Sequence, residues 1–140
     1  MKKYVCAFAV VVILGCLSLL ALLSFIFPDF DPCVNDMVGQ VQSPDGQFKA
    51  VIFERDCGAT TDFSTQVSIV PASTPLPDTA GNVFVADGNH GAAPPGRGGG
   101  PNVWVKWLNP KLIKIVYDKR AATYKMEKQY QNINITYEAQ

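Results

Sequence analysis

Residues 38–55 read VGQVQSPDGQFKAVIFER and decide the fold class, because two apolar-rich runs flank a turn sequence. In the turn SPDG, residues 43–46, proline presets φ, aspartate bonds to the nearby backbone and glycine accepts a positive φ. The runs on either side, residues 38–42 and 47–55, therefore predict two strands joined as a hairpin. We expect the chain around them to be mainly β.

The residues after this hairpin continue to alternate with a period of two rather than 3.6. The last run, residues 132–138, alternates apolar and polar residues, so one face would be buried and the other solvent-exposed. This strand should close the sheet. Residues 119–130 fit either one short helix or a loop followed by a strand. The predicted fold is a mainly β domain, built as an antiparallel sheet or a small sandwich. Its further predicted strands are residues 64–70, 82–86, 102–108, 111–117 and 132–138.

Two stretches are predicted to be irregular. Residues 91–101 read GAAPPGRGGGP, and their five glycines and three prolines exclude a helix or a strand. We expect an exposed, flexible loop between two strands, and whether it is functional or merely disordered stays open. The second stretch is residues 71–77.

The N-terminal stretch predicts a transmembrane helix at about residues 4–27. These 24 residues contain no Asp, Glu, Lys, Arg or His, and at about 1.5 Å per residue they span roughly 36 Å, against a hydrocarbon core of about 30 Å. Lys2 and Lys3 precede the stretch and acidic residues follow it, which predicts an N-terminus inside. The expected organisation is a single-pass anchor, residues 1–27, in the cytoplasmic membrane, and an extracytoplasmic domain, residues 28–140, in the periplasm or outside the cell.

Two processed forms of this anchor stay open. A cleaved secretory signal needs a shorter apolar core that ends at small residues. Lipidation at Cys16 needs the lipoprotein-like sequence ILGC, residues 13–16, but an apolar rather than a polar linker would follow it.

The cysteines outside the apolar stretch are Cys33 and Cys57. In an oxidising compartment, a pair that flanks a short segment of a small domain is expected to form a disulfide. Two buried, reduced cysteines are the alternative if the domain lies inside the cell.

Two features are candidate binding sites. The segment 55–62 is rich in small polar and turn-forming residues, with Arg55 as a partner for an anion or carboxylate. Trp104 and Trp107 lie on opposite faces of one predicted strand, so one of them is expected to be exposed beside the glycine-rich loop. The candidate binding residues are Arg55, Asp56, Thr60, Thr61, Asp62 and Trp104.

Catalytic and metal chemistry have weak signals. His90 is the single histidine, and a cysteine hydrolase would pair it with Cys57. Asp87 and Asn89 alternate as calcium ligands do, but the glycine and glutamate that a calcium loop has at positions 6 and 12 are replaced by Ala92 and Gly98, and a plain turn is favoured. Nucleotide, redox and zinc-protease motifs are lacking, so we expect no cofactor, no metal and no catalytic residues.

The SPDG turn leads into residues 48–53, and FERDCGATTDFSTQVSI follows at residues 53–69. Taken with the N-terminal stretch, these residues resemble an uncharacterised family of small bacterial membrane-anchored proteins, a domain of unknown function. The resemblance covers about half of the chain and implies no activity.

The charge balance, 12 basic and 12 acidic residues, gives no basic surface for nucleic acid. We therefore expect an extracytoplasmic binding or envelope-interaction protein whose partner is an envelope protein or a glycan. The alternatives are a small hydrolase that uses Asp56, Cys57 or His90, and an immunity or inhibitor protein that blocks a toxin at the membrane. The oligomeric state stays open.

Overall fold

The computed structural model describes the backbone of residues 2–26, 33–58 and 62–140. Two compact units contain these residues, one up to residue 32 and the other from Cys33 to Gln140.

The first unit consists of α1 (Lys2–Ile26). Its sequence is mostly apolar, and no proline or turn sequence interrupts the helix. Its described side chains, at residues 11–23, are all exposed. Among the residues that the structure describes, no helix meets the length and hydropathy needed to cross a membrane.

The second unit is mainly β, as predicted. Its strands are β1 (Val34–Gln42), β2 (Phe48–Asp56), β3 (Ser64–Pro71), β4 (Phe84–Asp87), β5 (Val103–Asn109), β6 (Leu112–Tyr117), β7 (Ala122–Met126), β8 (Gln129–Tyr130) and β9 (Ile133–Ala139).

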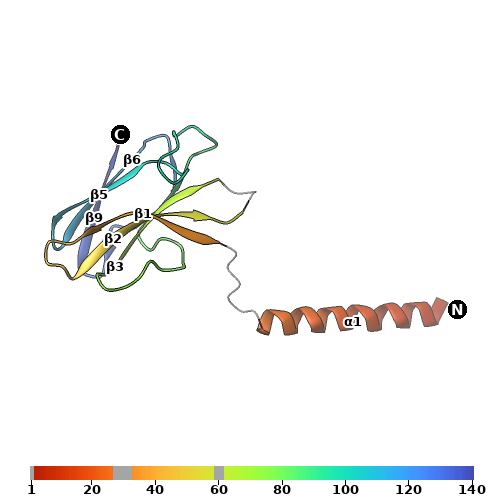
Figure 1. Cartoon of the computed structure of the whole chain (residues 1–140). Coiled ribbons are helices and arrows are strands. Elements are labelled where there is room, and N and C mark those ends of the chain that lie inside the picture. The colour runs from red at the N-terminus through yellow and green to blue at the C-terminus, as the bar shows by residue number, and fades with distance from the viewer. Residues whose placement is uncertain (1, 27–32, 59–61) are drawn as a thin grey trace. The chain divides into compact units, whose positions relative to one another are not determined.

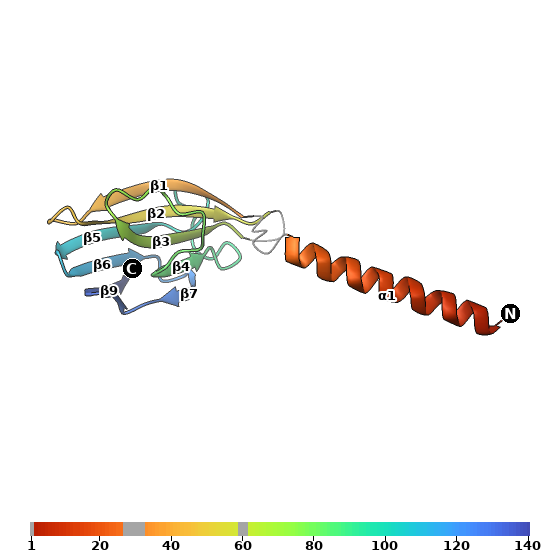
Figure 2. The same ribbon diagram turned by 90° about the horizontal axis from the view of Figure 1, so that it is seen from below.

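The described strands form two sheets. One is five-stranded, in the order β1-β2-β3-β4-β7, and the other is four-stranded, in the order β5-β6-β9-β8. Figures 1 and 2 show β1, β2 and β3 in one layer and β5, β6 and β9 in the other. Of the two predicted arrangements, the chain therefore forms the small sandwich.

The predicted SPDG hairpin is confirmed. β1 and β2 pair as antiparallel strands, and the Ser43 and Gly46 N–H groups close the turn at 2.9 Å on the carbonyl oxygens of Phe48 and Ser43. Asp45 accepts a 3.2 Å hydrogen bond from the Gln47 backbone N–H and a 2.6 Å bond from the Ser43 hydroxyl, and Gly46 has a φ of 71°. Asp45 and Gly46 thus act as their chemistry predicts.

Two predictions near the C-terminus need correction. β9 does not close a sheet edge: it lies between β6 and β8 and runs parallel to β6, with Ile113 opposite Ile135. Residues 119–130 form no short helix but the strands β7 and β8, and β7 extends the other sheet beyond β4. The strand alternative for this segment is therefore confirmed.

The predicted strand 82–86 begins later, at Phe84, because the side chain of Asn82 takes over the pairing that backbone groups would make. Its Oδ1 accepts the Ile69 N–H at 2.9 Å, and its Nδ2 donates to the Ile69 carbonyl at 2.8 Å. A side-chain amide satisfies both groups of a buried strand residue in this way.

The core lies between the two sheets, and both supply inward-facing side chains. Burial of each large aliphatic or aromatic side chain is worth about 1.5–3 kcal/mol. A direct link between the sheets is Trp107, whose Nε1 donates a 3.0 Å hydrogen bond to the Val41 carbonyl oxygen in β1. The buried core residues include Ile52, Val67, Ile69, Phe84, Val103, Trp107, Ile113, Ile115, Ile133 and Ile135.

The predicted disulfide between Cys33 and Cys57 is confirmed, with an S–S distance of 2.05 Å. Val34 is paired with Asp56 in the β1–β2 register, so the bond crosses from the residue before β1 to the residue after β2. It closes the open end of the hairpin opposite the SPDG turn.

Candidate functional site

The predicted binding segment, residues 55–62, does not present its arginine outward. Arg55 is 5% exposed, and its Nη1 donates a 2.6 Å hydrogen bond to the Asn35 side-chain oxygen. Asn35 in turn donates to the carbonyl oxygens of Pro77 and Thr79, at 2.7 and 2.8 Å. Arg55 therefore supports the contact of β1 with the irregular segment before β4, and anion binding by Arg55 stays a prediction.

The other candidate residues that the structure describes in this segment are exposed but not gathered in one place, with Asp56 at the end of β2 and Asp62 before β3. Asp56 is exposed and accepts a 2.8 Å hydrogen bond from the backbone N–H two residues later. Asp62 accepts the His90 N–H at 3.1 Å, and its Oδ2 lies 3.9 Å from Nδ1 of His90, whose side chain is 97% exposed. Thr60 and Thr61 lie outside the described residues.

The sulfur of Cys57 is bonded to Cys33, and a cysteine hydrolase would need it as a thiolate. A hydrolase that uses Asp56 or His90 stays an alternative. In the described ranges, no group of three His, Cys, Asp or Glu side chains is arranged to hold a metal ion.

The prediction that the two tryptophans face opposite ways is confirmed. Trp107 is 8% exposed and belongs to the core, whereas Trp104 is 55% exposed on the outer side of β5. β5 is an edge strand of its sheet. A large aromatic side chain at an exposed sheet edge is the kind of residue that contributes most to recognition.

The glycine-rich segment next to Trp104, residues 91–101, is irregular, as predicted. Most of it is exposed, but part of it is buried. Ala93, Gly100 and Pro101 are buried. The Gly96 N–H donates to the Gly100 carbonyl at 2.6 Å, and a β-bridge pairs Pro95 with Pro101. These contacts close residues 96–100 into a compact turn with Arg97 near its tip, and the flexibility of the loop stays a prediction.

The glycines of this turn are required by close packing against β2 and β3. A Cβ on Gly100 would lie 2.5 Å from Thr65 Oγ1 and 2.7 Å from the Thr65 backbone nitrogen. A Cβ on Gly98 would collide with the carboxylate of Glu54, and Gly99 has a φ of 98°. Only residues without a side chain let the backbone approach this closely.

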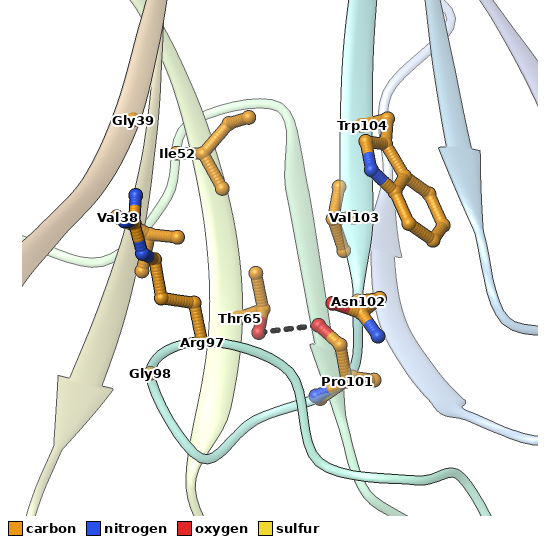
Figure 3. A pocket seen from close by; sticks show the side chains of 10 residues that line it. All are labelled: Val38, Gly39, Ile52, Thr65, Arg97, Gly98, Pro101, Asn102, Val103 and Trp104. Carbon is orange, nitrogen blue, oxygen red and sulfur yellow. Dashed lines mark hydrogen bonds between the residues drawn. The ribbon is translucent and has the colours of Figure 1, made fainter.

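A hollow of about 280 Å³ lies beside this turn, between the edges of the two sheets. Figure 3 shows Val38 and Ile52 on one side of it and Val103 and Trp104 on the other, with the Arg97 side chain rising from the turn on the side of Val38. The hydroxyl of Thr65 donates a 2.7 Å hydrogen bond to the Pro101 carbonyl and so fastens the turn to β3. The lining residues are Val38, Gly39, Ile52, Thr65, Arg97, Gly98, Pro101, Asn102, Val103 and Trp104.

A second hollow, of about 290 Å³, follows the first along β5. Val103 lines the first hollow, Val105 and Lys106 line the second, and Trp104 borders both. The remaining described residues of the second hollow are Val116 and Gln140. Trp104 is therefore the residue that the two hollows share.

Each hollow has one cationic residue, Arg97 in the first and Lys106 in the second. Among their described lining residues, none is acidic. We call Arg97, Trp104 and Lys106 together the β5 strip. Trp104 borders both hollows, and Arg97 lies across the first hollow from it. Together the two hollows offer two cations and one aromatic ring, which suits a ligand that carries negative charge.

The carboxylate closest to the turn is that of Glu54, which packs against Gly98 and Gly99. Burial raises the pKa of Glu54, and the nearby carboxylates of Asp36 and Asp56 raise it further. Glu54 therefore takes up a proton more readily than an exposed glutamate does.

Of the β5 strip, the sequence pointed to Trp104 alone. Arg97 was missed because it lies within a run of glycines that was interpreted as a flexible loop. The available signal is the run itself, because the clustered glycines of GRGGG at residues 96–100 favour a turn. Lys106 was missed because an exposed lysine on a strand is usually only a solvated residue.

Comparison of the chain with models of known families, with curated protein sequences and with solved structures finds no match. The resemblance to a family of small membrane-anchored proteins stays a prediction.

Proposed function

We propose that this chain is a single-pass protein of the cytoplasmic membrane whose β sandwich lies outside and binds a component of the cell envelope. The proposed anchor is the uncharged stretch of residues 4–27, and Lys2 and Lys3 before it keep its N-terminus inside. As a continuous helix these 24 residues would extend about 36 Å, against a hydrocarbon core of about 30 Å.

The disulfide supports this placement of the domain. Disulfides form and persist mainly in oxidising compartments, which lie outside the cytoplasmic membrane. The second unit starts at Cys33 and contains the whole Cys33–Cys57 bond. This unit is therefore suited to an oxidising compartment.

The observation that carries the binding function is the exposure of Trp104 between two hollows. An indole ring that is 55% exposed on a sheet edge leaves apolar area in water. Arg97 lines the first hollow and Lys106 the second, so each hollow has a charged hydrogen-bond donor. Tryptophan and arginine are both enriched among the residues that dominate binding energy.

Site-specific photo-crosslinking tests this function in the cells that make the protein. A photoreactive phenylalanine replaces Trp104 in one variant and Tyr124, an exposed aromatic residue on β7, in the control. We expect an adduct with an envelope component from position 104 and none from position 124. No adduct at position 104, or equal adducts at both positions, would refute binding at the β5 strip.

A further inference from the structure

We infer that the β5 strip binds a linear acidic saccharide, one whose successive sugar rings carry carboxylates. This inference rests on the proposed function and names the chemistry of its ligand. It takes the first hollow for one ring, the second hollow for another, and Trp104 for the contact between them.

Arg97 in the first hollow and Lys106 in the second favour a ligand with an anionic group for each hollow. Within the described part of the chain, no carboxylate lies within ion-pair distance of Arg97 or Lys106. By contrast, Lys114 pairs with Glu138 at 2.9 Å and Arg120 pairs with Asp118 at 2.7 Å. The guanidinium of Arg97 is therefore available for the two-pronged hydrogen bonding that suits a carboxylate.

Both hollows are small. At about 280 and 290 Å³, each lies near the lower end of the range of about 300–1,000 Å³ for small-molecule sites. Two such hollows in series, with an aromatic ring between them, fit a repeating ligand that offers one ring to each.

The polarity of the hollows distinguishes a saccharide from a peptide. A sugar ring has an apolar C–H face, which an indole covers, and an edge of hydroxyl groups that need hydrogen-bond partners. The first hollow offers the Asn102 amide beside its apolar residues, and the second offers the Gln140 amide. An extended peptide would instead pair its backbone with the edge strand β5, and an acidic peptide is therefore one arm of the test below.

Binding of defined oligosaccharides to the full chain tests this inference. The chain is purified in a polyoxyethylene detergent, because a sugar-based detergent would compete for the site. Calorimetry measures binding of oligogalacturonate, of the same oligosaccharide with its carboxylates methyl-esterified, and of oligoglutamate. Fluorescence distinguishes exposed Trp104 from buried Trp107 and reports contact with the ring.

We expect oligogalacturonate to bind and to change the Trp104 emission, and the ester and oligoglutamate to bind at least tenfold more weakly. Arg97→Gln and Lys106→Gln should each weaken binding by roughly tenfold, as expected for the loss of a charged hydrogen bond. Trp104→Ala should weaken it by a similar factor. The matched control Arg120→Gln, a surface arginine outside both hollows, should leave binding unchanged.

Three outcomes would overturn the inference. Equal binding of oligogalacturonate and oligoglutamate would mean that the strip recognises carboxylates without the sugar. Equal binding of the acid and its ester would exclude the charge argument. No binding of the acid would exclude the ligand class, and a Trp104-specific crosslink in cells would then still support the proposed function with another partner.

Discussion

Gly100 is the residue whose replacement tests most directly why the loop is rich in glycine. An alanine there would place its Cβ against Thr65, including a backbone nitrogen of β3 that cannot move freely. We expect Gly100→Ala to lower the free energy of unfolding by about 1–3 kcal/mol, as overpacking does. Chemical denaturation measures this change.

The control for that experiment is Gly39→Ala. Gly39 has open space where its Cβ would lie, so this substitution should change the free energy of unfolding by less than about 0.5 kcal/mol. Similar effects of the two substitutions would mean that the glycines serve chain flexibility rather than close packing.

Glu54 gives the fold a pH dependence of a defined sign. Its folded-state pKa is raised above the ordinary value of 4.5, with burial as the main cause. At a pH between the unfolded-state pKa of 4.5 and the raised folded-state pKa, the folded chain binds more protons than the unfolded chain. The contribution of Glu54 to stability therefore falls as pH rises. A single group can change the free energy of unfolding by at most about 1.4 kcal/mol per pH unit.

We therefore expect Glu54→Gln to be more stable than the wild type at neutral pH. The difference between the two should shrink as pH falls and disappear below about pH 4.5, where glutamate is protonated in both states. Thermal unfolding of both proteins from pH 4 to pH 8 measures it. A variant that is less stable at neutral pH would show that the ionised carboxylate supports the turn.

At the scale of elements, the disulfide stabilises the β1–β2 hairpin at its open end. The two cysteines are 24 residues apart, and closing such a loop is worth about 2–4 kcal/mol. We expect Cys33→Ser/Cys57→Ser to lower the unfolding midpoint by several degrees or more. Non-reducing mass analysis of the wild type should find both thiols blocked, and a freely alkylated Cys57 with unchanged stability would contradict this role.

Local chemistry explains which elements could be predicted from the sequence. The SPDG hairpin could be, because proline, aspartate and glycine each specify their own part of the turn. The parallel pairing of β6 and β9 could not, because alternation reveals the buried face of a strand but not its neighbour. The short β8 was missed for the same reason, since two residues carry no period.

The candidate site was predicted in part, again for physical reasons. Trp104 was identified because alternation within β5 places it opposite the buried Trp107. Arg55 was expected to face a ligand, but the β1–β2 register brings Asn35 to it, and register depends on the whole sheet. Arg97 depends on a turn closed by bonds within the loop, which composition alone suggests to be mobile.

At the scale of the whole molecule, the proposed function requires the sandwich and the N-terminus to lie on opposite sides of a membrane. The positively charged start and the apolar stretch of residues 4–27 argue for this arrangement, and the disulfide argues for the oxidising side. The placement of the domain therefore decides whether the β5 strip meets envelope components at all.

The most direct test is a fusion after Gln140 of a reporter enzyme that is active only when exported, assayed in whole cells and after membrane fractionation. We predict an active fusion of full length that sediments with the membranes. A soluble, active fusion shortened at its N-terminus would show a cleaved signal in place of the anchor. An inactive fusion retained in the cytoplasm would contradict the topology, the compartment of the disulfide and the envelope ligand together.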